Sequence, residues 1–215
     1  MVRKRADSFR IALDTLRAEL RAGVHAAGVR LTANDIADRL ALSATPVREA
    51  LSRLAGEGLL QERRGQGFFV PRLQEHDLVA LLRLQLELLL IACEREPPPA
   101  SGVDVEPQAA VASDAAPSLG SVLPDERLMR ALAAGASPPL ARHLVRLQDQ
   151  LAPIRAAEGR VLGTPAGELE RLAEAVSGRD PDRLRSVLRE FFARRIASAP
   201  QLARLHEAAK NIESI

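Results

Sequence analysis

Three side chains that can bind a polyanion lie close together in the chain: Ser43, Thr45 and Arg48. A hydroxyl in the first turn of a helix, together with the free backbone N–H groups there, can bind a phosphate. A guanidinium one turn further along can donate two hydrogen bonds to O6 and N7 of guanine. If these residues begin a helix, their chemistry is that of duplex DNA recognition.

Enzyme chemistry finds little support in the sequence. No nucleophile, base and orienting group recur at motif spacing, and neither a phosphate-binding loop nor a cluster of metal ligands is present. Gly65-Gln66-Gly67 lies where a hairpin tip is expected and is not a cofactor loop. The single cysteine, Cys93, falls in an apolar helical pattern that is typical of a small buried side chain. We therefore expect a protein that is not an enzyme and that needs no cofactor.

The charge distribution favours a polyanion as the partner of the N-terminal third. Residues 1–75 hold 13 Lys/Arg and 9 Asp/Glu, whereas residues 76–215 hold 17 and 19, so that the overall charge of +2 conceals an asymmetry. Basic side chains that neutralise phosphates release condensed counterions. The chain has no Trp or Tyr and only 5 Phe, which leaves few aromatic platforms for single-stranded bases. Double-stranded DNA is therefore the expected partner.

Three helices are predicted around these candidate residues. Apolar side chains at helical spacing predict the first helix over residues 8–22. Thr32 is a typical N-cap for a second helix, and Ser43 is a candidate N-cap for a third. The third helix then carries Val47 on its inner stripe and Arg48 on the opposite face.

A β-hairpin is predicted directly after the third helix. The alternating runs 59–63 and 67–71 flank the basic, glycine-bearing tip Arg64-Gly65-Gln66, and residues 28–31 form a short extended step earlier in the chain. Helix, helix, turn, helix and hairpin is the order of a winged helix-turn-helix, whose third helix enters the major groove. We therefore predict such a DNA-binding domain over residues 1–74.

The remaining chain, residues 75–215, is predicted to be an all-helical domain for dimerisation and effector binding, which makes the fold mostly α. A Pro-rich segment, 97–124, interrupts the helical pattern and is expected to be a flexible loop. Pro153 is expected to kink or break one helix. The predicted helices span residues 76–95, 125–135, 138–157, 165–178, 181–198 and 200–212.

The sequence predicts a soluble, cytoplasmic protein. The first residues are basic and polar and no apolar segment follows them, so that no signal peptide is recognised. The longest apolar stretch, 78–93, contains Arg83, Gln85 and Glu87, which is typical of a buried or interfacial helix and not of a membrane span.

The segment 42–70 reads LSATPVREALSRLAGEGLLQERRGQGFFV and contains a TPVREAL core, an LxxEGLL stretch and a GxGFFV wing. By these motifs it resembles the GntR family of bacterial transcriptional regulators. The resemblance extends over about residues 8–73. The helical remainder is more loosely similar to the ligand-binding domain of the FadR-like branch, because Arg83 and Glu87 match its RxxxE pattern.

The resemblance implies DNA contacts by Ser43, Thr45, Arg48 and the wing-tip Gly65. Two positions depart from the family pattern: Ala44 stands where an Arg is usual, and Asn34 stands where many members carry a basic residue. Both departures remove DNA contacts and put the usual operator sequence in doubt. We expect replacement phosphate contacts from Arg63, Arg64 and the arm Arg3-Lys4-Arg5.

Many family members bind a divalent metal through an Asp and three His, and this set is not conserved in the sequence. Asp125 matches the Asp, whereas Met129, Leu169 and Phe192 stand at the three His positions, and none of them binds a metal as imidazole does. The four histidines of the chain lie outside this register. No metal site is therefore predicted.

An effector site is predicted at Arg83, Asp125, Met129 and Phe192, and its state is left open. Apolar replacements for imidazoles either line a cavity for an apolar or acyl-like ligand or pack that cavity shut. Arg83 either holds a carboxylate of the ligand or pairs with Glu87 four residues further on.

Together these features predict a sequence-specific transcriptional regulator, a repressor, that binds an inverted-repeat operator as a homodimer under the control of a small-molecule effector. The alternative is a diverged relative that works mainly as a protein-interaction subunit and has a packed-shut pocket. The loss of basic residues at Ala44 and Asn34 favours that alternative.

Overall fold

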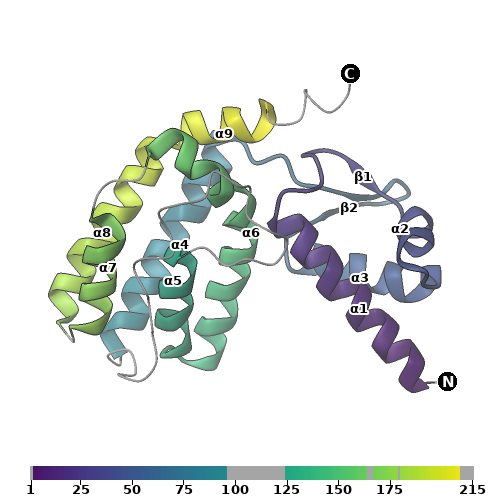
Figure 1. Ribbon diagram of the computed structural model, residues 1–215, viewed down its shortest axis with the longest axis horizontal. Helices are drawn as coiled ribbons and strands as arrows, with labels where there is room; N and C mark the ends of the chain where they lie inside the picture. Colours follow the sequence, from purple (N-terminus) through teal and green to yellow (C-terminus); the bar gives the residue numbers. More distant parts are fainter. Residues whose placement is uncertain (1, 96–123, 164–166, 179, 209–215) are drawn as a thin grey trace.

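The computed structural model describes residues 2–95, 124–163, 167–178 and 180–208. Figure 1 shows a small α/β unit formed by the N-terminal elements beside a larger helical bundle formed by the rest. The predicted loop over 97–124 lies outside the described residues except for Pro124, which begins a helix. Within the described residues no helix is long and apolar enough to cross a membrane.

The N-terminal unit has the predicted order of elements. It comprises α1 (Val2–Arg21), β1 (Arg30–Leu31), α2 (Ala33–Leu40), α3 (Ala44–Gly56), β2 (Gln61–Arg63) and β3 (Gly67–Phe69). The strands form an antiparallel sheet in the order β1-β3-β2, in which Arg30 and Gln61 both lie opposite Phe69. The first helix begins earlier than predicted, because no Gly or Pro interrupts residues 2–7.

The turn between α2 and α3 depends on one residue in an unusual conformation. Thr32 caps α2 as predicted, since its hydroxyl accepts a hydrogen bond from the Asp35 N–H at 3.3 Å. At the other end Ala41 adopts a left-handed conformation with φ 51°. The N–H of Leu42 then donates back to the Ala37 carbonyl at 2.9 Å, which closes the helix as in a Schellman motif.

The second unit consists of helices in its described residues. Its helices are α4 (Glu75–Arg95), α5 (Pro124–Ala134), α6 (Pro138–Leu162), α7 (Glu168–Ser177), α8 (Pro181–Ala197) and α9 (Ala199–Ala208). The predicted end of one helix at residue 157 is wrong, because α6 continues through Pro153 to Leu162. A proline removes only one backbone donor, and packing of α6 against α1, α4, α5 and α9 keeps the helix continuous.

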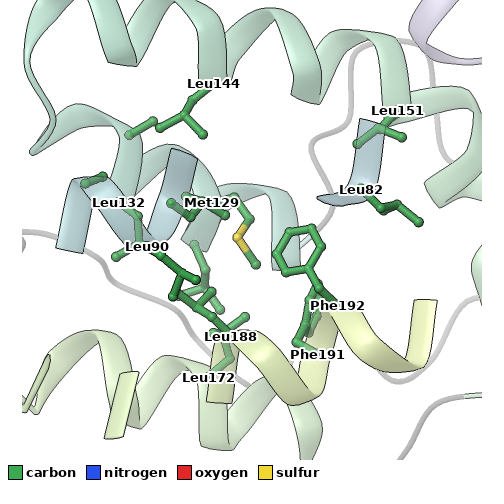
Figure 2. Close-up of a cluster of buried hydrophobic side chains, with 14 of the residues drawn as sticks. Leu82, Leu90, Met129, Leu132, Leu144, Leu151, Leu172, Leu188, Phe191 and Phe192 are labelled. Carbon is green, nitrogen blue, oxygen red and sulfur yellow. The ribbon is translucent and has the colours of Figure 1, made fainter. Parts of the chain in front are cut away.

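Each unit has its own apolar core. One cluster of buried side chains runs from Ala12 to Val70, and the other runs from Leu78 to Leu202 and contains Cys93. Figure 2 shows part of the second cluster, where leucines of α4 and α6 meet the rings of Phe191 and Phe192. The domain boundary predicted after residue 74 falls between the two clusters and remains a prediction.

Candidate nucleic-acid interface

The helix α3 has a buried face and an exposed face that separate the predicted roles of its residues. Val47 and Leu51 are completely buried in the N-terminal core. Arg48 is exposed on the opposite side, as its spacing from these residues predicts. Its guanidinium is therefore available to a ligand outside the domain.

The N-terminal end of α3 presents two hydroxyls to solvent. Ser43 occupies the N-cap position with φ −81° and ψ 153°, but its side chain makes no capping hydrogen bond. Ser43 and Thr45 are both exposed. The first N–H groups of a helix lack partners within the helix and attract anions. This end of α3 can accordingly bind a phosphate through hydroxyl and backbone donors together.

The hairpin carries its arginines on the outside of the sheet. Arg63 lies over the ring of Phe69 at 4.4 Å from the ring centroid, which orients its guanidinium. Arg64 is exposed at the tip, next to Gly65, whose φ of +73° favours glycine. The space around the Gly65 Cα is open, so that a DNA backbone can approach it closely. Arg30 on β1 adds a further exposed basic side chain beside Gly67.

A buried carboxylate joins the first two helices beneath this surface. Glu19 of α1 accepts hydrogen bonds from both terminal nitrogens of Arg39 on α2, at 2.5 and 2.8 Å, and contacts His25 at 2.8 Å. Burial alone raises the pKa of the Glu19 carboxyl, but the Arg39 and His25 contacts outweigh it and lower that pKa below its ordinary value. This interaction ties α2 to α1 and so steadies the helix that precedes α3.

The two departures from the family pattern lie in different surroundings. Asn34 is exposed near the start of α2, whereas Ala44 is half-buried and packs against the core. An Arg at position 34 would reach solvent and hence DNA. The small side chain of Ala44 instead packs against the N-terminal core, so that this position stabilises the domain and offers no charge to DNA.

The structure does not bring the four predicted effector residues together. Met129 and Phe192 have no water-accessible surface and lie among leucines in the helical core (Figure 2). Asp125 is buried, whereas Arg83 is exposed on α4. A cavity of about 50 Å³ lies elsewhere, between Leu59 and Gln150, and none of the four residues lines it.

The residue that pairs with Asp125 is one that the sequence analysis missed. Arg155 on α6 has a side chain that is 1 % exposed, and it donates to Asp125 Oδ2 at 2.5 Å and to Gln85 Oε1 at 2.9 Å. A signal was present in the sequence. Leu144, Leu151 and Arg155 occur at helical spacing, which places Arg155 on the apolar face of its helix.

A metal does not fit the residues around Asp125. Its carboxylate is already neutralised by the Arg155 guanidinium, and Met129 and Phe192, at two of the family's His positions, offer a thioether and a carbon ring instead of imidazole. Among the described residues no group of three or more His, Cys, Asp and Glu is placed to hold a metal ion. The absence of a metal site remains a prediction.

A second buried arginine lies near the first, because its partner Glu158 is one turn from Arg155 on α6. Arg195 on α8 contacts Glu158 at 2.9 Å and Glu168 at 3.2 Å, and its guanidinium lies 3.3 Å from the centroid of the Phe191 ring. Burial raises the pKa of the Glu158 carboxyl even though Arg195 lowers it. These charges link α6, α7 and α8 inside the domain.

The fold and the exposed groups of α3 and the hairpin define the N-terminal unit as a winged helix-turn-helix domain of the DNA-binding class. Residues 11–70 match the gntR family of bacterial regulatory proteins. The match covers this domain, so that the N-terminal unit is similar to the DNA-binding domains of that family.

Curated relatives agree with this assignment over the same region. The chain is 38 % identical over 77 residues to the HTH-type transcriptional regulator McbR of Escherichia coli (strain K12), which is 36 % of this chain and 35 % of that protein. It is 38 % identical over 72 residues to the Nta operon transcriptional regulator of Aminobacter aminovorans, or 32 % and 34 % of the two chains. The aligned segments thus span about a third of these relatives. The matched family and both relatives are named as regulators, in keeping with the expectation of a protein that is not an enzyme.

Solved structures match nearly the whole chain in fold. Escherichia coli McbR/YncC superposes with a TM-score of 0.67 at 23 % identity, covering 90 % of this chain and 97 % of that one. A GntR transcriptional regulator from Rhodococcus sp. RHA1 gives 0.68 at 19 % identity with the same coverage. The predicted architecture, a winged helix-turn-helix followed by a helical domain, is confirmed.

Proposed function

We propose that this protein is a sequence-specific transcriptional repressor that binds an inverted-repeat DNA operator as a homodimer. The observation that carries the proposal is the exposed end of α3, where Ser43, Thr45 and Arg48 face solvent while Val47 is buried. Hydroxyls at a helix terminus bind phosphate, and an arginine one turn further on reaches guanine. The exposed arginines of the hairpin add phosphate contacts beside it.

An apolar strip on the helical domain supports the homodimer. Leu84 and Ile91 lie two turns apart on α4 and are 48 % and 46 % exposed. Side chains seven residues apart share a helix face, so that the strip continues along α4. A second copy of the chain would cover this strip and double the DNA interface.

For the effector, the packing around Met129 and Phe192 supports the packed-shut alternative over an open pocket. Neither side chain faces a water-sized space, and Arg83 lies on the exposed side of α4. The proposal therefore assigns the helical domain to dimerisation and requires no ligand for DNA binding. Effector control at these four residues would need a rearrangement of the core.

Selection from random duplex DNA with the purified protein alone tests the proposal. The proposal expects an enriched inverted repeat that shifts as one complex with two copies of the chain, and a dimer by light scattering at micromolar concentration. A monomer in solution would contradict the homodimer. Failure to enrich any sequence would instead favour the interaction-subunit alternative.

A further inference from the structure

The junction between the two domains contains a chain of alternating arginines and carboxylates. Arg17 and Arg21 lie one turn apart at the end of α1, and both donate to Asp149 of α6, with Arg17 Nη1 at 2.9 Å from Asp149 Oδ2. Arg21 also donates to Glu126 of α5. The Asp149 side chain is only 3 % exposed. The last turn of α1 is therefore tied to the helical domain through a buried carboxylate.

The end of α3 is tied to the same place. Glu57 is the C-cap of α3. Its Oε2 atom lies 2.7 Å from Arg17 Nη2 and forms an ion pair with it. Gln150 of α6 donates to the Glu57 carbonyl at 2.8 Å. Gly58 leaves room for this contact, because a Cβ there would lie 2.3 Å from Gln150 Nε2. Neighbouring residues of α6 thus hold both α1 and α3.

The strength of the junction comes from burial and from paired charges together. Burial alone lowers the pKa of the Arg17 guanidinium, but the contacts with Asp149 and Glu57 outweigh it and raise that pKa. Rotation of the N-terminal domain on the bundle would separate these groups and leave buried charges without partners, which is strongly unfavourable. The packing of α1 against α6, seen in Figure 1, opposes the same rotation.

This attachment has a geometric consequence on DNA. In a dimer joined through the helical domains, the direction of α3 relative to α6 sets the separation and the angle of the two α3 helices. Two such helices bind consecutive major grooves on one face of B-DNA when they lie about 34–36 Å apart. A rigid junction therefore accepts one half-site spacing, and a loosened junction accepts several.

We propose that Asp149 and Gln150 are positioning residues that select the spacing between the two half-sites of the operator. They lie on α6 and act through Arg17 and Glu57. The inference rests on the proposed function, because it requires a dimer on an inverted repeat.

The test uses the half-site that the wild-type protein selects from random DNA. Affinities are measured for inverted repeats whose spacer changes by one base pair at a time, and for a duplex with a single half-site. We expect the wild type to prefer one spacer several-fold over its neighbours. Gln150→Ala and Asp149→Asn should reduce the difference in affinity between the preferred spacer and its neighbours several-fold. The affinity for the duplex with a single half-site should stay unchanged.

Arg130→Gln is the matched control. Arg130 contacts Glu126 at 2.8 Å and lies 3.9 Å from Asp149 at the edge of the same network, but all three residues belong to the helical domain. This variant removes ion pairs within the helical domain and leaves the direct contacts between the domains intact. It should retain the wild-type spacer preference.

The outcomes separate the two proposals. If the wild type selects one spacer and both variants keep that preference, the spacing inference is wrong and the proposed function stands. An equal loss of affinity for all DNAs, including the single half-site, would also overturn the inference, since the residues would then only maintain the fold. If Asp149→Asn unfolds the protein, Gln150→Ala decides alone. A wild type that binds no inverted repeat overturns both proposals.

Discussion

At the residue scale, Arg48 is expected to distinguish one DNA sequence from another. Arg48→Ala should weaken binding to the selected operator by about 1–3 kcal/mol, because a two-bond contact to guanine is lost. Binding to random DNA should change much less. Titrations of wild type and variant with matched and scrambled duplexes measure both effects, and equal losses on the two DNAs would identify Arg48 as a backbone contact.

Arg64 at the tip of the hairpin is expected to behave differently. Arg64→Ala should weaken operator and random DNA alike, because a phosphate contact carries no sequence information. The slope of log K against log salt should become shallower by about one unit. Affinities at several salt concentrations provide this slope, and an unchanged slope would exclude a phosphate contact by Arg64.

The surroundings of a residue could be predicted where they depend on its own helix alone, and not where they depend on how two helices pack. The exposure of Ser43, Thr45 and Arg48 followed from spacing along one helix. The pairing of Asp125 with Arg155 joins two helices and depends on how they pack, which spacing along one of them does not determine. The predicted grouping of Arg83 with Phe192 was based on resemblance to the family. In the structure Arg83 lies on the outer face of α4, whereas Phe192 lies in the core.

At the scale of elements, the turn before α3 carries strain that a substitution can remove. Ala41 has φ 51°, in the left-handed region, where a side chain with a Cβ is disfavoured by about 1–2 kcal/mol. Ala41→Gly removes this strain but adds backbone entropy to the unfolded chain. We expect a net gain of up to about 1 kcal/mol in the free energy of unfolding, measured by urea denaturation. A loss of stability would contradict the strain at this turn.

The joint between α1 and α2 should make the N-terminal domain sensitive to acid. The folded pKa of Glu19 lies below its ordinary value of 4.5, so that its ionised form adds stability above that pH and loses it as the pH falls through the folded pKa. Glu19→Gln should reduce the free energy of unfolding at neutral pH by about 1.5–3 kcal/mol, since charge-assisted hydrogen bonds are lost.

Urea midpoints measured from neutral to acidic pH test this difference. The difference in urea midpoint between wild type and Glu19→Gln should become smaller below pH 4.5. The exposed Glu62 provides a control, because Glu62→Gln removes a carboxyl outside the core. A gap that is constant with pH would show that the charge of Glu19 does not stabilise the joint.

Most elements could be predicted because their signals are local, and the differences have physical causes. The cap at Thr32 and the hairpin around Arg64 follow from side-chain and turn chemistry within a few residues. The continuity of α6 through Pro153 could not be predicted from local propensity, because tertiary packing outweighs the lost hydrogen bond.

At the scale of the whole molecule, the relation between the domains is the feature that the sequence reveals least. Arg17 and Asp149 are 132 residues apart, and neither stands out in its own segment as a charge that meets a distant partner. Charged residues on predicted helices are usually solvated, so that only the assembled fold identifies these two as a link. This link connects the DNA-binding surface to the domain that would form the dimer.

Whether the chain binds a specific DNA sequence is decided by one ratio of affinities. The affinity of the wild-type protein for its selected inverted repeat is divided by its affinity for a duplex of the same composition with scrambled half-sites, at one stated salt concentration. Sequence-specific binding predicts a ratio of at least about 10³, as is typical of specific regulators. Equal affinities for the two duplexes would contradict it.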